Sequence, residues 1–366
     1  LEGYDVMFVT GTDEHGQKIQ KSADKRKLSP DIFCNEISKV FLDLTKTLNL
    51  SNTDFIRTTE IRHHKTVQKL WKILEEKKFI YLSKYSGWYS VSDEAFYTES
   101  EIVEKDNIKL CEASGSVVEW VEEESYFFKL SEFQNLLIKH YEDNPEFIQP
   151  SSRRNEVMSF VKGGLNDLSI SRNSFKWGIS VPNSKDHIVY VWLDALTNYL
   201  TATNYFDENS SWPADVHIIG KDILRFHAVY WPAFLLAAEI PLPKKIFGHG
   251  WILSGDEKMS KSKGNILDPI EIVNEFGLDE IRYYLMKEVM YGLDGNINID
   301  NLKNCINSDL ANNIGNLSQR IFVLINKYFS CKVPDPKSFL NGDQKFMEYP
   351  VEGLRKFMDS FEIHNY

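Results

Sequence analysis

The spacing of hydrophobic positions predicts a strand and then a helix near the start of the chain. Residues 6–10 form a short β-branched and aromatic run that ends at Gly11, which is typical of a buried strand followed by a loop. After the loop, apolar residues three and four positions apart predict a helix with Ser29 as its cap and Pro30 as its first residue. The face expected to be buried consists of Ile32, Phe33, Ile37, Val40, Phe41, Leu44 and Leu48. Strand and helix together predict half of a βα unit.

The middle of the chain has a different pattern. From about residue 77 to 183 it is irregular and aromatic, and alternating runs at 87–91 and 116–120 predict small antiparallel strands of an insertion domain. Buried-strand runs return at 188–193, 216–220 and 245–251. Strands that alternate with helices predict a parallel sheet, which binds ligands at the carboxyl ends of its strands. The residues expected at that edge are Asp13, Trp192, Lys221 and His249.

The last third of the chain is predicted to be helical. One helix is capped by Asp268 and stopped by Gly277, and a second runs from Ile281 to Val289. A longer apolar stripe follows between residues 301 and 329 and is typical of a helical bundle. The stripe consists of Leu302, Ile306, Leu310, Ile314, Leu317, Ile321, Leu324 and Ile325.

Composition narrows the class of protein. The chain has 366 residues, of which 42% are hydrophobic and 26% charged, and no apolar run approaches the ~18 residues of a membrane span. Four scattered cysteines suggest neither a metal knuckle nor a disulfide framework and favour a reducing cytosol. The net charge of -11 argues against indiscriminate nucleic-acid binding, although the basic cluster at residues 21–27 can still hold a polyanion.

A lysine-rich loop changes this picture. Residues 256–265 place three lysines among small residues, and a loop of this composition is usually a solvated surface turn. The string Lys258-Met-Ser-Lys-Ser262, however, arises by chance in roughly one chain in ten thousand of this length. A functional motif is therefore the better interpretation.

This string resembles the second signature of class I aminoacyl-tRNA synthetases, and the wider chain resembles the methionyl-tRNA synthetase family from residue 1 to about residue 325. The matching segments are Gly11-Thr-Asp-Glu-His-Gly-Gln-Lys18, Tyr190-Val-Trp-Leu-Asp-Ala195, Ile219-Gly-Lys-Asp-Ile223, Phe226-His227, Trp231-Pro232 and residues 248–264. The resemblance implies an α/β fold, in which an insertion (connective-peptide) domain splits a Rossmann-like parallel-sheet catalytic domain that an α-helical bundle follows.

The domain boundaries follow from the pattern and the resemblance together. We expect the first part of the catalytic domain at 1–76, the insertion at 77–183 and the second part at 184–254. The lysine loop and a stem-contact region should occupy 255–298. A truncated anticodon-binding helical domain should occupy 299–366.

The resemblance also implies a reaction. L-methionine and ATP give methionyl-adenylate and pyrophosphate, and methionyl then passes to the 3′-terminal ribose of tRNA(Met), for initiation and elongation of translation. Lys258 and Lys261 are the expected catalytic cations, because phosphate charge must be stabilised where it develops. Further ATP contacts are expected from Lys221, His249, Gly250, Ser260 and Ser262, and Mg²⁺ is implied on the pyrophosphate.

The methionine pocket is carried over position by position. Asp13 matches the residue that holds the substrate ammonium, and the side-chain pocket matches Trp192, Ala195, Tyr199, Ile223 and His227. Local pattern alone leaves other roles open: a helix cap for Asp13, and core packing for the aromatic residues and the histidine. Leu196 stands where the family often has proline, and Tyr230 where some members have phenylalanine.

Two further pairs of residues could have either a role in the site or an ordinary structural role. Arg172 and Asp222 match positions near the amino-acid and ATP sites, as a supporting ion pair or as an ordinary structural salt bridge. Asn316 and Arg320 lie one helical turn apart and resemble the segment that reads the CAU anticodon, unless they are only a polar bundle face.

The insertion is expected to be free of metal. Ser90 and Asp93 stand where zinc-bearing members have a Cys-x-x-Cys pair, and Cys111 alone cannot make a thiolate site. We therefore predict no structural zinc.

The first class I signature, His-x-Gly-His, is expected to precede Leu1, so we interpret the chain as a fragment that also stops within the anticodon domain. Two alternatives stay open: a class I synthetase for another aliphatic amino acid, and a non-catalytic tRNA-binding paralogue. Retention of Lys258, Lys261 and Asp13 favours an enzyme. We expect a cytoplasmic monomer whose partners are tRNA(Met), L-methionine and ATP. We do not expect it to bind a membrane.

Overall fold

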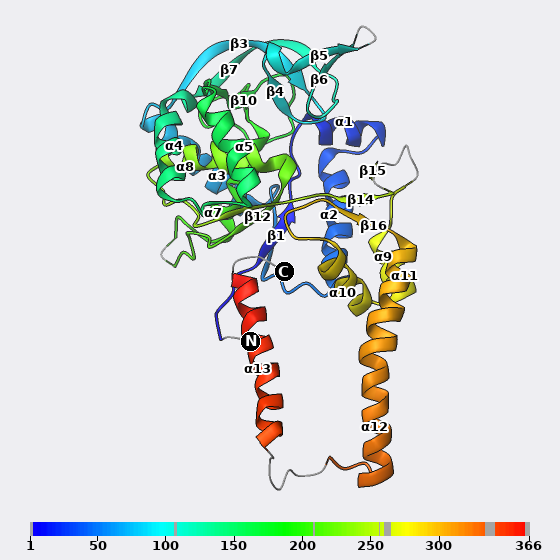
Figure 1. Ribbon diagram of the computed structural model, residues 1–366. Helices are drawn as coiled ribbons and strands as arrows, with labels where there is room; N and C mark the ends of the chain where they lie inside the picture. Colours follow the sequence, from blue (N-terminus) through cyan, green and yellow to red (C-terminus); the bar gives the residue numbers. More distant parts are fainter. Residues whose placement is uncertain are drawn as a thin grey trace. The chain divides into compact units, whose positions relative to one another are not determined.

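A computed structural model describes residues 3–105, 108–207, 209–255, 257–259, 265–333 and 341–362. The chain divides into two compact units, Leu1–Gly248 and His249–Tyr366 (Figure 1). The α-helices of the first unit are α1 (Gln17–Lys25), α2 (Pro30–Thr47), α3 (Ile61–Glu76), α4 (Gln134–Asp143), α5 (Ser151–Lys162), α6 (Val191–Leu196), α7 (Asn198–Ala202) and α8 (Trp231–Ala237). Its strands are β1 (Val9–Thr12), β2 (Asp54–Arg57), β3 (Ile80–Ser90), β4 (Ala95–Tyr97), β5 (Ile102–Lys105), β6 (Ile108–Cys111), β7 (Glu119–Phe128), β8 (Ile148–Gln149), β9 (Leu168–Ser169), β10 (Ser171–Arg172), β11 (Ile188–Val189), β12 (His217–Gly220) and β13 (Ile246–His249).

The second unit is mainly helical. Its α-helices are α9 (Pro269–Phe276), α10 (Leu278–Glu288), α11 (Ile299–Cys305), α12 (Asn316–Phe329) and α13 (Asn341–Glu362), and its strands are β14 (Ile252–Ser254), β15 (Glu257–Lys258) and β16 (Gly295–Ile297). Within the described part of the chain, we find no helix with both the length and the apolar character of a membrane span.

The first strand, β1, pairs in parallel with β2, which confirms the predicted βα unit. The strand, however, starts later in the sequence than predicted. β1 begins at Val9, and Val6, Met7 and Phe8 are exposed instead of buried. An apolar run shows only a tendency to extend, whereas the partner strand decides which residues form the ladder. β2 lies beside residues 9–12, so the strand ends where the loop with Asp13 begins.

The helix after this loop starts as predicted, with Pro30 at its first position, but its expected burial is wrong in part. Phe33 is buried, whereas Ile32, Val40 and Phe41 are about half exposed. Phe33 and Cys34 pack against Ala23 of α1. The position of α1, and not the full width of the apolar stripe, therefore decides which face of α2 is buried.

The insertion contains antiparallel strands, as predicted, but with other bounds. β3 extends the first predicted run toward the amino terminus, whereas β7 begins only at Glu119, near the end of the second. β3 pairs with β7 from Ile80↔Phe128 to Tyr89↔Glu119, and the strands of this region gather at one end of the first unit (Figure 1). β8, from the same stretch of sequence, pairs in parallel with β13. The predicted insertion boundaries remain predictions.

Hydroxyl groups hold together the turn of the insertion where zinc-bearing relatives of the predicted family have cysteines. Asp93 accepts hydrogen bonds from Tyr97 Oη (2.8 Å), Ser114 Oγ (2.6 Å) and Ser116 Oγ (2.7 Å). Among the residues described, no group of three His, Cys, Asp or Glu side chains is arranged to hold a metal ion. Asp93 thus links its own turn to the segment of Ser114 and Ser116 through hydrogen bonds.

The expectation of a strand over residues 188–193 is wrong in its second half. Only Ile188 and Val189 form a strand, antiparallel to β10, and α6 starts at Val191. A short buried apolar run has no periodicity that separates a strand from a buried helix. As a result Trp192 lies on a helix just beyond a strand end.

The core of the first unit is built from helices packed on these strands. Trp71 and Leu70 of α3 and Trp231 and Phe234 of α8 are fully buried and belong to one apolar cluster. Phe128 of β7 joins the same cluster and packs edge-on against Phe234 at 4.8 Å. The insertion region and the segments before and after it in the sequence therefore share one core.

In the second unit, the predicted start and stop signals of the helices are confirmed, but much of the predicted apolar stripe is not buried. The Asp268 carboxylate accepts from the Ile270 and Glu271 amides at 2.8 and 3.4 Å, and Gly277 ends α9 with φ of 96°. Helical structure continues from Ile299 through a π-helix (Ile306–Gly315) to Phe329. The stripe residues Ile314, Leu317, Ile321 and Leu324 are nevertheless exposed. A stripe sets which face can be buried, but burial requires an element packed on it.

We predict that Leu70→Ala lowers the free energy of unfolding by about 2–5 kcal/mol, because it leaves a cavity in the shared core. Urea denaturation measures the change. Lys72→Ala, at an exposed position two residues further along α3, is the control and should change stability by less than about 0.5 kcal/mol. Equal effects of the two substitutions would contradict this core.

Candidate functional site

A small cavity lies beside the loop that follows β1. Its volume is about 170 Å³, below the roughly 300–1,000 Å³ of pockets for drug-sized ligands, and it suits a ligand about as large as one amino acid. Three predicted methionine-pocket residues, Asp13, Trp192 and Ala195, line it together. The other lining residues are His15, Lys18, Ile19, Glu94 and Val191.

Asp13 presents a carboxylate to this cavity. The side chain is open to solvent on the cavity side and surrounded by protein on the others. The pKa of Asp13 is raised to about 6, chiefly by burial and also by repulsion from Asp194, while His63 and His15 act in the opposite direction. A cation that enters the cavity would favour the ionised carboxylate, so the site suits a positively charged group.

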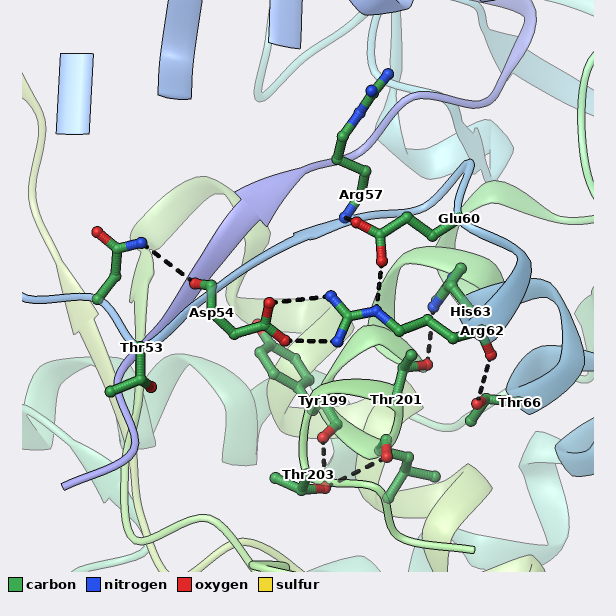
Figure 2. A network of polar contacts seen from close by, with 12 residues as sticks. Thr53, Asp54, Arg57, Glu60, Arg62, His63, Thr66, Tyr199, Thr201 and Thr203 are labelled. Carbon is green, nitrogen blue, oxygen red and sulfur yellow. Dashed lines mark hydrogen bonds and ion pairs between the residues drawn. The ribbon is translucent and has the colours of Figure 1, made fainter. Parts of the chain in front are cut away.

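A buried network fixes the loop behind Asp13. The Asp194 carboxylate is fully buried and bonds to His15 Nδ1 at 2.6 Å and to His63 Nε2 at 2.8 Å. His63 Nδ1 in turn lies 2.9 Å from Thr201 Oγ1. Figure 2 shows these two side chains pointing toward one another. Burial alone would raise the pKa of Asp194, but the two histidines hold it below its usual value. The network connects the loop with α3, α6 and α7.

A second set of bonds fixes the backbone of the same loop. Arg57 donates to both carboxylate oxygens of Glu14, at 2.7 and 2.9 Å, and Trp177 Nε1 donates to the Glu14 carbonyl at 2.6 Å. Bidentate arginine–carboxylate pairs are geometrically specific. Glu14 therefore anchors the loop while its neighbour Asp13 stays available.

The remaining predicted methionine residues form a second group. Tyr199 Oη lies 2.7 Å from His227 Nε2, and His227 Nδ1 lies 3.0 Å from the Ile223 carbonyl. Burial lowers the pKa of His227 to about 4, so the ring is neutral. Its Nδ1 donates a hydrogen bond to the Ile223 carbonyl, and its Nε2 accepts a hydrogen bond from the Tyr199 hydroxyl. Trp192 joins this group to the cavity, because its ring lies 6.5 Å from that of His227.

Trp192 is itself held by an aromatic partner. Its ring stacks on Phe226 with centroids 3.7 Å apart and planes 8° from parallel. The indole Nε1 is buried without a hydrogen-bond partner among the described residues. The wall of the cavity is therefore aromatic and apolar at this point.

Arg172 is buried in an aromatic cage near the insertion. Its guanidinium lies 4.4 Å from the ring centre of Phe96 and 4.5 Å from that of Tyr190, and it donates to Ser169 Oγ at 2.9 Å. Asp222 lies in a short 3₁₀ helix (Lys221–Ile223) that follows β12. The predicted ion pair between Arg172 and Asp222 remains a prediction.

The predicted ATP residues are only partly described. Lys221 directly follows β12, and His249 ends β13 with Nδ1 2.8 Å from the Gly250 carbonyl. A Cβ at Gly250 would lie 2.2 Å from the Leu293 backbone, so this close approach requires glycine. Lys258 lies in β15 with Nζ 4.1 Å from the centre of the Trp251 ring. Ser260, Lys261 and Ser262 lie outside the described residues.

The predicted anticodon residues share one face of α12. Arg320 Nε donates to Asn316 Oδ1 at 3.1 Å, and Arg320 is exposed. A larger open hollow of about 650 Å³ runs along this helix, and neither residue lines it. The pair is accessible for base contacts, and its role remains a prediction.

Sequence reasoning missed several residues of the cavity. His15, Lys18 and Ile19 follow Asp13 in or beside the matched segment, so their positions gave a signal that was not used. Glu94 is different, because it comes from the insertion about eighty residues later. No local pattern connects that turn to the loop of Asp13.

Comparisons with known proteins identify the family of the chain. Residues 1–322 match the model of the family described as tRNA synthetases class I (M). The methionine–tRNA ligase of Rickettsia prowazekii is 56% identical over 353 residues, which cover 95% of this chain and 68% of that protein. That of Rickettsia conorii is 54% identical over 338 residues, covering 91% of this chain and 66% of the relative. The chain thus spans about two thirds of the length of these curated relatives.

A solved structure gives the same result. Methionyl-tRNA synthetase of Mycobacterium tuberculosis bound by methionyl-adenylate superposes with a TM-score of 0.95 at 46% identity, covering 99% of this chain and 72% of that one. This likeness confirms the predicted α/β fold with its Rossmann-like catalytic domain and helical region. The chain belongs to the class I tRNA synthetases, in the family of the methionine–tRNA ligases.

Proposed function

We propose that this chain activates L-methionine with ATP to methionyl-adenylate and pyrophosphate, and transfers methionyl to the 3′-terminal ribose of tRNA(Met). The observation that carries the proposal is the cavity in which the Asp13 carboxylate lies beside the apolar wall of Trp192 and Ala195. A carboxylate suits the ammonium group, and an aromatic wall suits a thioether, which gains ~0.3–1.5 kcal/mol from such a neighbour. The relative from M. tuberculosis was solved with methionyl-adenylate.

The neutral pair of Tyr199 and His227 supports this choice of side chain. Because His227 is neutral and both of its ring nitrogens are hydrogen-bonded, the pair of Tyr199 and His227 presents no net charge. An uncharged side chain pays no penalty for lost ion hydration there. We propose that Tyr199, Ile223 and His227 surround the thioether end.

The ATP site is proposed from the lysine loop and the strand ends. Lys258 and Lys261 would stabilise charge on the phosphates, with Ser260 and Ser262 as hydroxyl donors and Lys221, His249 and Gly250 near the nucleotide. Where the chain is described, no three acidic, histidine or cysteine side chains form a metal site. The Mg²⁺ that the reaction class implies would therefore be held chiefly by phosphate oxygens and water.

Two further proposals concern ligands and partners. Arg172 would support the amino-acid site through its cage of rings, with or without Asp222. Asn316 and Arg320 would contact the anticodon of tRNA(Met) from α12. The predictions of a monomer and of a cytoplasmic location remain predictions.

The reaction itself is tested by pyrophosphate exchange. We expect methionine, but not leucine or isoleucine, to support exchange between pyrophosphate and ATP. Lys258→Ala should lower the exchange rate by about 10²–10³, the typical cost of losing a group that stabilises transition-state charge. The exposed Lys332→Ala is the control and should leave the rate unchanged. Stimulation by leucine alone would favour the alternative synthetase, and no stimulation by any of the three would favour the non-catalytic paralogue.

We predict that Asp13→Asn makes the protein more stable at pH 8 while it abolishes exchange. The folded pKa of about 6 lies above the ordinary value of 3.8, so the ionised carboxylate disfavours folding once the pH exceeds both values. Urea midpoints of variant and wild type should therefore differ most at pH 8 and converge below about pH 4. Asp24→Asn, at an exposed position in α1, is the control. A variant less stable than wild type at pH 8 would contradict the argument.

We predict that Arg320→Ala raises the KM for tRNA(Met) in aminoacylation by an amount equivalent to roughly 1–3 kcal/mol, because a base contact is lost. Methionine-dependent pyrophosphate exchange should not change, since it needs no tRNA. Lys327→Ala on the same helix is the matched control. If both variants behave alike, the predicted anticodon role is wrong.

A further inference from the structure

Glu94 reaches the amino-acid cavity from a different part of the chain than Asp13. It follows β3 in the turn of the insertion, yet its side chain lines the same cavity as Asp13, Lys18 and Trp192. A cavity of about 170 Å³ is small, so a ligand that fills it lies close to both carboxylates.

The turn around Glu94 is firmly held. Its backbone is left-handed, with φ of 51°, and its carbonyl accepts from Tyr190 Oη at 2.8 Å. The preceding Asp93 is fixed by three hydroxyl groups, as described above. The backbone that carries the Glu94 side chain is therefore held in place by these contacts.

The carboxylate lies against the first turn of α1. Glu94 Oε1 accepts from the Lys18 amide at 3.4 Å. A Cβ on Gly16, which has φ of 105°, would lie only 2.1 Å from the same oxygen. Glycine at position 16 thus leaves room for Glu94, and glutamate is favourable at a helix amino terminus.

Helix capping does not by itself account for this position. The bond from the Lys18 amide is long, and an ionised carboxylate has about four acceptor sites. Capping also gains nothing from a second carboxylate, Asp13, on the same small cavity, because like charges repel. A cationic ligand between them would remove that repulsion.

We propose that Glu94 is a second substrate-binding carboxylate, which together with Asp13 takes the ammonium group of the amino acid. The inference rests on the proposed function, since the ligand is the methionine of that reaction. It implies that the cavity accepts α-amino acids and amino alcohols with a free amine and discriminates against analogues without one.

The surrounding charges predict a proton linkage. Burial raises the pKa of Glu94 to about 7, and Asp13 contributes in the same direction, whereas the Lys18 amide, the Lys18 ammonium and Arg172 lower it. The other titratable group on the cavity wall is His15, which is bonded to Asp194. At pH 6.5 the two carboxyl groups are partly protonated, so an entering ammonium group displaces protons into solution.

Calorimetric titration of the full chain tests this inference. L-methionine and methioninol are titrated at pH 6.5 in two buffers that differ in ionisation enthalpy, which gives the Kd and the number of protons released. We expect Glu94→Gln to weaken both ligands roughly 10–100-fold, as for loss of a charged hydrogen-bond partner, and to reduce the proton release. Glutamine still accepts from the Lys18 amide, so a role limited to helix capping would survive this change.

Two controls separate the possible outcomes. Glu112→Gln, at an exposed position in the insertion, should leave Kd and proton release unchanged. 4-(Methylthio)butanoic acid, which lacks the amine, should bind weakly and equally to wild type and Glu94→Gln. The proton count of wild type is a measurement that does not depend on how well a variant folds.

Wild-type binding with no proton release, or equal Kd values for wild type and Glu94→Gln, would overturn the role of Glu94 and leave the proposed function intact. Wild type that binds neither methionine nor methioninol would overturn the proposed function, and the role of Glu94 with it.

Discussion

The ion-paired, buried carboxylate of Asp194 is the interaction on which the cavity beside Asp13 depends. It bonds to His15 in the loop after β1 and to His63 in α3, while its own helix carries Trp192 and Ala195. A buried charge is costly unless it is paired, so these segments are stable in one relative position only. The distance between the Asp13 carboxylate and the aromatic wall of the cavity is set by this requirement.

The loop around Asp13 contains charged side chains in two different settings. Glu14 and His15 are buried and fully engaged by Arg57 and Asp194, whereas Asp13, one residue earlier, faces the cavity. Its raised pKa records the cost of keeping a carboxylate among protein atoms and near Asp194. Groups that bind ligands are commonly kept in such an unfavourable state, and the ligand supplies the missing interaction.

The insertion helps to determine the geometry of the cavity through contacts with the rest of the first unit. Its core residue Phe128 packs on Phe234 of the catalytic domain, and Tyr190, which precedes the pocket helix, bonds to the turn at Glu94. The hydroxyl cluster on Asp93 stabilises that turn by hydrogen bonds. The geometry of the cavity therefore depends on contacts between segments about eighty and one hundred residues apart.

The sequence by itself determined what depends on neighbours along the chain. Pro30, Asp268 and Gly277 act within one turn of their helices, and the alternating strands of the insertion have a period that shows directly in the residues. Matched segments also brought Asp13, Trp192 and Ala195 into one predicted pocket, and the structure places all three on one cavity. Their motifs were recognisable because each lies in a short continuous stretch.

Only the tertiary structure decided what depends on partners far away. It determined that β1 begins at Val9, where β2 lies beside it, and that α6 replaces the second half of an expected strand. It also determined that Phe33 is buried and Phe41 is not. Glu94 shows the same limit in the site, because the residue that meets Asp13 is chosen by packing of the insertion. A sequence pattern specifies which surfaces can be buried or charged, and long-range packing selects which of them meet.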